Sequence, residues 1–113
     1  MKIVKRPEFL KLPAGTLYSK YEPCAFESLD IKGDTLPGGN DWCYQQIVDA
    51  IENTGSSDFS EKLFRAEETG ESLAMDFDCQ GRDGCFEDDS QLFAVWERAD
   101  VEALIERLKA TLG

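Results

Sequence analysis

Carboxylates form the densest set of side chains in this sequence that could do chemistry, and they gather in its second half. Carboxylate oxygens bind hard cations, and clustered carboxylates attract positively charged protein surfaces. Nine acidic residues fall between positions 67 and 89. They are Glu67, Glu68, Glu71, Asp76, Asp78, Asp83, Glu87, Asp88 and Asp89. We predict that these nine residues form a binding surface.

The segment DFDCQGRDGCFE, which starts at Asp76, resembles the twelve-residue calcium loop of EF-hand proteins. Asp76 and Asp78 match the first and third positions, Gly81 matches the sharp turn at the sixth, and Glu87 matches the bidentate ligand at the twelfth. The resemblance implies a Ca²⁺ ion held by Asp76, Asp78, Gln80 and Glu87.

Three features depart from that calcium motif. Gln80 stands at the fifth position, where the family has Asp or Asn. Asp83 stands at the eighth, where an apolar residue normally packs, and the flanking segments have the pattern of strands rather than helices. The alternative is a solvated connection between two strands, which binds no cofactor.

The net charge of -11 is unevenly distributed along the chain. Residues 1–22 carry five basic and two acidic side chains, a net of +3, whereas the remainder carries seven basic and 21 acidic side chains, a net of -14. Such a surface repels nucleic acid and anionic membranes. We therefore expect a basic partner protein, which includes the nucleic-acid-binding face of another protein. The alternative is that the charge serves solubility alone.

The chain contains no histidine, which excludes Ser-His-Asp and Cys-His catalysis and HExxH zinc sites. Phosphate-binding motifs of the GxxxxGK[ST] and GxGxxG types are also missing from the sequence. We therefore expect a protein that is not an enzyme. The alternative is an enzyme that uses carboxylates and cysteine.

Four dispersed cysteines and the N-terminal sequence bear on the compartment. Cys24, Cys43, Cys79 and Cys85 form no CxxC motif, so we expect free thiols in a reducing cytoplasm. A disulfide or a metal site is the alternative, and Cys79 with Cys85 is the nearest pair. The opening MKIVKRPEF lacks the apolar core of a secretory signal, which also favours the cytoplasm.

Short strands and amphipathic helices must position these side chains. Leu73, Met75 and Phe77 alternate with polar residues, the run 92–98 is almost wholly apolar, and an apolar stripe follows Asp100, a plausible N-cap. We expect strands at 2–4, 16–21, 26–32, 71–78 and 92–98, and helices at 8–11, 41–53, 58–69 and 101–112. A strand at the start of 41–53 is the alternative there, because Trp42 and Tyr44 favour one. The last two strands should form a hairpin covered by the last helix.

These elements predict the fold class. We expect a single α+β domain over residues 1–113, with an antiparallel sheet of about four to five strands and two to three helices packed on one face.

Both ends of the chain, EFLKLPAGTLYSKYEPC and MDFD…DDSQLFAVWERADVEALIERL, resemble small proteins encoded by bacteriophages and prophages. The resemblance implies a short accessory protein in the host cytoplasm. It favours an inhibitor of host defence or nucleic-acid machinery, such as an anti-CRISPR or DNA-mimic protein. We thus expect a non-catalytic binding protein that presents an acidic face to a basic host protein. The alternatives are a calcium-binding module and a self-assembling structural component.

Overall fold

The computed structural model describes residues 1–84 and 88–113. It divides the chain into two compact units. The sheet unit comprises residues 1–46 and 80–113, and the insert unit comprises residues 47–79. The expectation of one domain over 1–113 stays a prediction, and each unit is described by itself.

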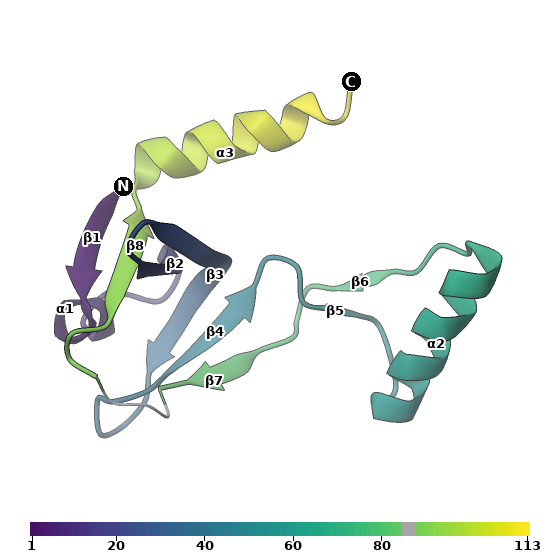
Figure 1. Ribbon diagram of the computed structural model, residues 1–113, viewed down its shortest axis with the longest axis horizontal. Coiled ribbons are helices and arrows are strands. Elements are labelled where there is room, and N and C mark those ends of the chain that lie inside the picture. The colour runs from purple at the N-terminus through teal and green to yellow at the C-terminus, as the bar shows by residue number, and fades with distance from the viewer. Residues whose placement is uncertain (85–87) are drawn as a thin grey trace. The chain divides into compact units, whose positions relative to one another are not determined.

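The sheet unit is an antiparallel sheet of six strands with two helices (Figure 1). In chain order its elements are β1 (Lys2–Lys5), α1 (Arg6–Leu10), β2 (Leu17–Glu22), β3 (Ala25–Thr35), β4 (Trp42–Gln46), β7 (Gly81–Asp83), β8 (Leu92–Trp96) and α3 (Arg98–Ala110). The strands lie in the order β1-β8-β2-β3-β4-β7. The α+β class and the antiparallel sheet are therefore confirmed, with six strands in the main sheet where four or five were expected.

An aromatic core lies between α1 and one face of this sheet. Pro7 stands at the start of α1, where its missing N–H costs no hydrogen bond, and the helix directs Phe9 onto the sheet. The Phe9 ring stacks on Phe93 with centroids 3.9 Å apart and meets Tyr18 and Trp42 edge-on at 4.7 and 5.0 Å. All four residues are fully buried. Val4 and Val95 complete the buried cluster.

The predicted hairpin between residues 71–78 and 92–98 is wrong. Strand β8 lies between β1 and β2, and Phe93 lies opposite Val4 on one side and Lys20 on the other. Its apolar side chains occupy both faces, so β8 suits the interior of a sheet better than an edge. The segment 71–78 contributes only β6 (Met75–Asp76), which pairs with β5 (Ala50–Ile51).

The insert unit is a two-stranded ladder with one helix between its two strands in the sequence. Strands β5 and β6 flank α2 (Ser56–Thr69) in the sequence, and Ile51 lies opposite Met75. Helix α2 ends at Gly70, which has a φ of 70° and thus the left-handed conformation of a helix C-cap. The predicted helix at 58–69 is confirmed, whereas that at 41–53 is wrong because this segment forms β4 and β5.

The capping of α3 differs from the prediction. Glu97 is the N-cap, and Asp100 occupies the third helical position. The Asp100 carboxylate accepts the Glu97 main-chain N–H at 2.9 Å, which satisfies a donor at the start of the helix. Across the described residues, no helix has the length and apolar character needed to cross a membrane.

Candidate functional site

The nine acidic residues predicted as a binding surface are divided between the two units. The insert unit holds Glu67, Glu68, Glu71, Asp76 and Asp78, and the sheet unit holds Asp83, Asp88 and Asp89. Glu87 lies outside the described residues. Because the two groups belong to different units, we consider each as a separate surface.

The insert unit carries most of the negative charge. Its 33 residues include nine acidic and two basic side chains, a net of -7, whereas the sheet unit has a net of -4. Both basic residues of the insert unit are already paired: Lys62 lies 3.2 Å from Asp58, and Arg65 lies 2.5 Å from Glu71. The hydrogen bond to Glu71 also raises the pKa of Arg65. The negative charge of this unit is therefore left largely uncompensated.

Helix α2 presents three exposed glutamates around an exposed phenylalanine. Phe64 is 64% exposed, and Glu61, Glu67 and Glu68 stand three or four residues from it, which places all three beside its ring on the helix surface. Among the described residues, none of these glutamates forms a hydrogen bond or an ion pair. The predicted residues Glu67 and Glu68 thus remain available to a partner.

Sequence reasoning missed Glu61 and Phe64 as parts of this surface. Phe59, Leu63 and Ala66 form the apolar stripe of this helix at helical spacing, and Phe64 lies outside it. At 100° per residue, Phe64 points about 140° away from Phe59, on the polar side of the helix. An aromatic side chain at such a position is a signal that the sequence already contained.

A small apolar groove lies within the insert unit, beside α2. Its volume is about 180 Å³, and its walls are formed by Val48, Asp49, Ala50, Ile51, Phe59, Leu63 and Met75. Val48 and Phe77, in the same unit, are each 73% exposed. The unit therefore exposes apolar side chains among its carboxylates, an arrangement typical of surfaces that bind other proteins.

The other predicted carboxylates of the insert unit are less free. Asp76 is half-buried in β6, and one of its oxygens accepts the main-chain N–H of Asp78 at 2.8 Å. Asp78 is exposed, and Glu71 is held by Arg65. We therefore place the centre of the candidate surface on α2.

In the sheet unit, Asp83 and Asp88 already have partners within the chain. Asp83 lies 2.5 Å from the Nζ atom of Lys20 and accepts the Gly84 N–H at 2.7 Å. Asp88 accepts the N–H and the hydroxyl of Ser90 at 2.9 and 2.6 Å, and these bonds lower the pKa of Asp88. Asp89 is exposed. These carboxylates stabilise local structure, so they are weaker candidates for partner contacts.

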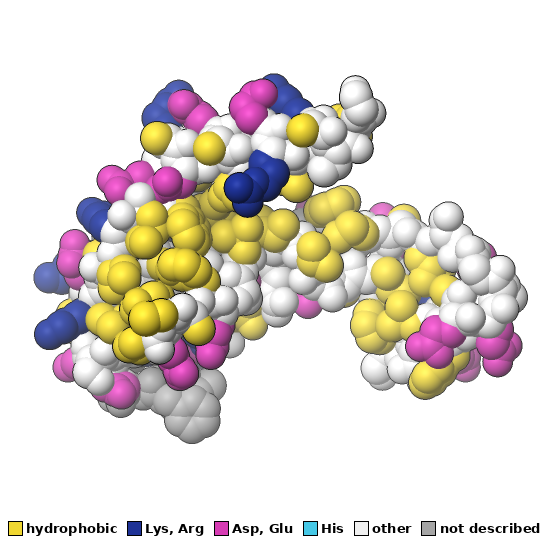
Figure 2. All heavy atoms as spheres, turned by 45° about the horizontal axis from the view of Figure 1, so that its top comes forward, with side chains coloured by type: hydrophobic (Ala, Val, Ile, Leu, Met, Phe, Trp, Pro, Cys, Tyr) yellow, Lys and Arg dark blue, Asp and Glu magenta, His cyan; other side chains and the backbone are white. Residues whose placement is uncertain are grey.

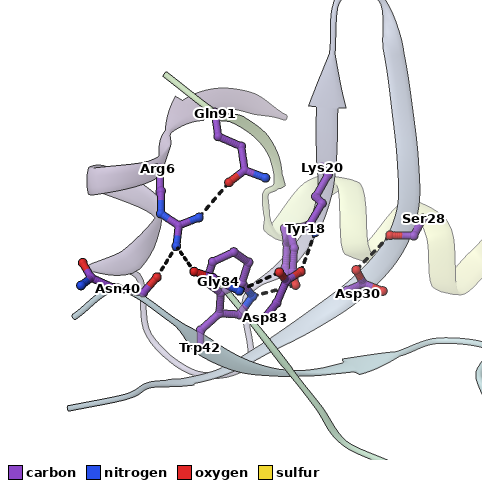
Figure 3. Close-up of polar contacts among 10 residues, drawn as sticks. All are labelled: Arg6, Tyr18, Lys20, Ser28, Asp30, Asn40, Trp42, Asp83, Gly84 and Gln91. Atoms are coloured by element: carbon purple, nitrogen blue, oxygen red, sulfur yellow. Dashed lines mark hydrogen bonds and ion pairs between the residues drawn. The ribbon is translucent and has the colours of Figure 1, made fainter. Parts of the chain in front are cut away.

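Arg6 holds both ends of the acidic segment that joins β7 to β8 (Figure 3). Arg6 is only 2% exposed, and its guanidinium donates to the side chain of Gln91 at 2.8 Å and to the main-chain carbonyls of Asn40 and Gly84. It also lies 5.1 Å from the centre of the Trp42 ring, a cation–π contact. Because the Arg6 N–H bonds the Gln91 carbonyl at 2.9 Å as well, this one residue ties the segment to the core.

In the described part of the proposed calcium loop, residues 76–84, the turn of the motif is replaced by a strand. Gly81, which should make its sharp turn, is the first residue of β7 and lies opposite Tyr44 in the sheet. Gln80 belongs to the sheet unit, whereas Asp76 and Asp78 belong to the insert unit, and Glu87 lies outside the described residues. No group of three His, Cys, Asp or Glu side chains suited to a metal occurs among residues 1–84 and 88–113. Calcium binding stays a prediction.

The cysteine pairing suggested by the sequence is also left open. Cys24, Cys43 and Cys79 are free thiols, and Cys85 lies outside the described residues. A hydrogen bond to Asp49 raises the pKa of the Cys79 thiol, which lowers its thiolate fraction and its reactivity.

Comparison with protein-family models, curated proteins and solved structures finds no match to this chain. The geometry and charge of the two units are therefore the features that bear on function, and the resemblance to phage proteins stays a prediction.

Proposed function

We propose that this chain is a non-catalytic binding protein whose insert unit docks on a basic surface of a partner protein. The observation that supports this most strongly is a net charge of -7 within 33 residues, where both basic side chains are already paired. A positive partner is attracted to such a surface at long range and docks faster for it.

Apolar contacts would supply the affinity that charge alone does not. Charged groups at the rim of an interface mainly affect association rate and specificity, whereas buried aromatic side chains carry most of the binding energy. Phe64 is the natural anchor, because it is exposed and surrounded by Glu61, Glu67 and Glu68. The partner surface should therefore combine Lys and Arg residues with an apolar depression.

The partner we propose is a basic host protein, and a nucleic-acid-binding face is a suitable target. On such a face the carboxylates of α2 would take the place of phosphates. Direct binding of the chain to nucleic acid or to an anionic membrane is disfavoured by its charge of -11. With the resemblance to phage proteins, this favours an accessory inhibitor that acts in the host cytoplasm without a cofactor.

The test compares two variants that have equal charge but differ in position. One variant carries Glu61→Gln, Glu67→Gln and Glu68→Gln in α2. The control carries Glu8→Gln, Glu22→Gln and Glu27→Gln in the sheet unit, at three exposed sites. Both variants change the net charge from -11 to -8, so any difference between them reports where the charge lies.

The partner is first captured from a bacterial lysate with the parent chain and identified, and its dissociation constant is then measured for each variant. We expect the α2 variant to weaken binding about tenfold, equivalent to about 1.4 kcal/mol, and the control to change it less than twofold. Parent binding should also weaken as salt rises. Equal affinities for both variants, or capture that is insensitive to salt, would contradict the proposed function.

A further inference from the structure

Helix α3 of the sheet unit has an apolar stripe that its own chain does not cover. Val101, Leu104, Ile105 and Leu108 follow at helical spacing, Leu112 comes two residues after the helix ends at Ala110, and α3 contains no buried residue. Exposure increases along the stripe, from 45% at Ile105 to 64% at Leu108 and 85% at Leu112. The first half of the stripe faces the sheet unit, and the second half has no apolar partner among the described residues.

An open apolar groove runs beside α3 in the same unit. It has a volume of about 400 Å³ and lies between Phe26, Leu29 and Trp96 on the sheet and Ala103, Leu104 and Arg107 on the helix. The Phe26 ring packs 5.3 Å from Trp96, yet Phe26 is 51% exposed. Figure 2 shows hydrophobic side chains open to solvent directly beneath α3. The groove is therefore formed but not filled.

Charges along α3 are arranged in opposite senses at its two ends. At its start, the carboxylates of Glu97 and Asp100 share one cation, the Met1 ammonium, at 3.0 and 2.6 Å, and Arg98 pairs with Glu102. Near its end, Arg107 and Lys109 are accompanied by one acidic residue, Glu106, which lies 3.4 Å from Lys109. The start of α3 therefore keeps a net charge of about -1 and its end a net charge of about +1. Arg107 lines the groove and forms no hydrogen bond or ion pair with any described residue. Two such helices in antiparallel orientation place the acidic turn of one opposite the basic turn of the other, which also aligns their dipoles favourably.

We propose that this face is a homodimer interface, in which the outer half of α3 from one copy lies in the groove beside α3 of a second copy. A two-fold interface requires one surface that carries both complementary features. This face has an exposed apolar stripe, an open and mainly apolar groove, and one net negative and one net positive end, which lie opposite each other only in the antiparallel sense. The inference is independent of the proposed function, because it uses the sheet unit alone.

The test measures the mass of the full chain by sedimentation equilibrium, with two variants matched in chemistry. Leu108→Glu places a carboxylate in the interface, and Phe64→Glu makes the same kind of change on α2 at a residue with the same exposed fraction of 64%. We expect a dimer for the parent and for Phe64→Glu, with a dissociation constant of about 1–10 µM. Leu108→Glu should be a monomer, with an unchanged circular dichroism spectrum.

Arg107→Glu provides a second variant, which should raise the dissociation constant of the dimer about tenfold or more. A parent that is monomeric at about 100 µM would overturn the inference. That result would stand even if a small apolar molecule or another protein occupied the groove. A dimer that survives Leu108→Glu would overturn it too, because the interface would lie elsewhere. The two proposals fail separately: Leu108→Glu should leave partner capture intact, and the glutamine triple in α2 should leave the dimer intact.

Discussion

The anchoring role of Arg6 leads to a quantitative prediction for the stability of the sheet unit. Arg6→Met keeps an apolar stem of similar length but removes the donors to Gln91, Asn40 and Gly84. The Gly84 contact is long at 3.4 Å, so two strong hydrogen bonds from a charged donor are lost. Each such bond contributes about 1.5–3 kcal/mol.

Two further effects partly cancel. The variant loses the cation–π contact with Trp42, but it also removes a charge that is costly to bury. We expect a net loss of about 3 kcal/mol in the free energy of unfolding, against a total of about 5–15 kcal/mol for a domain of this kind. The melting temperature should then fall by about 12 °C, and the variant should still fold.

Urea unfolding followed by tryptophan fluorescence measures this change. Lys5→Met is the control, because Lys5 is the exposed neighbour of Arg6 and its loss should cost less than about 0.5 kcal/mol. Arg6→Lys should lie between the two, since an ammonium group keeps the charge but not the planar fork of donors. Hydrogen exchange should also become faster at Gln91, whose N–H bonds the Asp88 carbonyl at 3.0 Å. If Arg6→Met were as stable as Lys5→Met, Arg6 would not be the anchor.

Two further predictions concern the sheet unit, one at Gly84, directly after β7, and one at the buried Tyr18. Gly84→Ala should lower the urea midpoint more than Gly38→Ala. Both glycines have positive φ, so the backbone cost is shared. A Cβ at Gly84 would lie 2.4 Å from the Asp41 side chain, whereas a Cβ at Gly38 meets no described atom within 4 Å. Equal midpoints would contradict this account. Tyr18→Phe should cost about 1–3 kcal/mol, because the buried Trp42 indole N–H loses its acceptor at 2.9 Å. Burial raises the pKa of Tyr18 above its ordinary 10.0. The free energy of unfolding should therefore keep its full value below pH 10 and decrease as the pH rises through the pKa of the folded state. The decrease should be smaller in Tyr18→Phe, which has no phenol to ionise.

The sequence predicted the fold class because its strongest local patterns survive in the structure. The apolar run at 92–98 became β8, and Pro7 marked the start of α1. These signals depend on residues close together in the chain. Strand pairing does not, and the predicted hairpin failed because β8 pairs with β1 and β2 from the other end of the chain.

Residues 41–53 show how local spacing misleads. Tyr44, Ile47, Val48 and Ile51 fit helical spacing, but aromatic and β-branched residues also favour strands. The structure resolves this choice through distant contacts. Trp42 packs against Phe9 and donates to Tyr18, and the Tyr44 ring lies so close to Gly81 that a Cβ there would be 2.7 Å away.

The candidate site was predictable in its charge but not in its pairing. The sequence gives the number of carboxylates and their position along the chain. It does not show that Lys20 pairs with Asp83, because the two residues lie on β2 and β7, which are far apart in the sequence. It also does not show that the chain divides between Asp78 and Asp83, which assigns the predicted acidic residues to two different units.

The insert unit occupies the connection between β4 and β7, two strands that pair directly, with Tyr44 opposite Gly81. The end of β4 and the start of β7 are therefore adjacent in the sheet, so a two-residue turn could also connect these two strands. Each doubling of such a connection costs only about 0.6 kcal/mol in closure entropy. A change in the sequence or length of residues 47–79 therefore leaves the register of β4 and β7 unaffected.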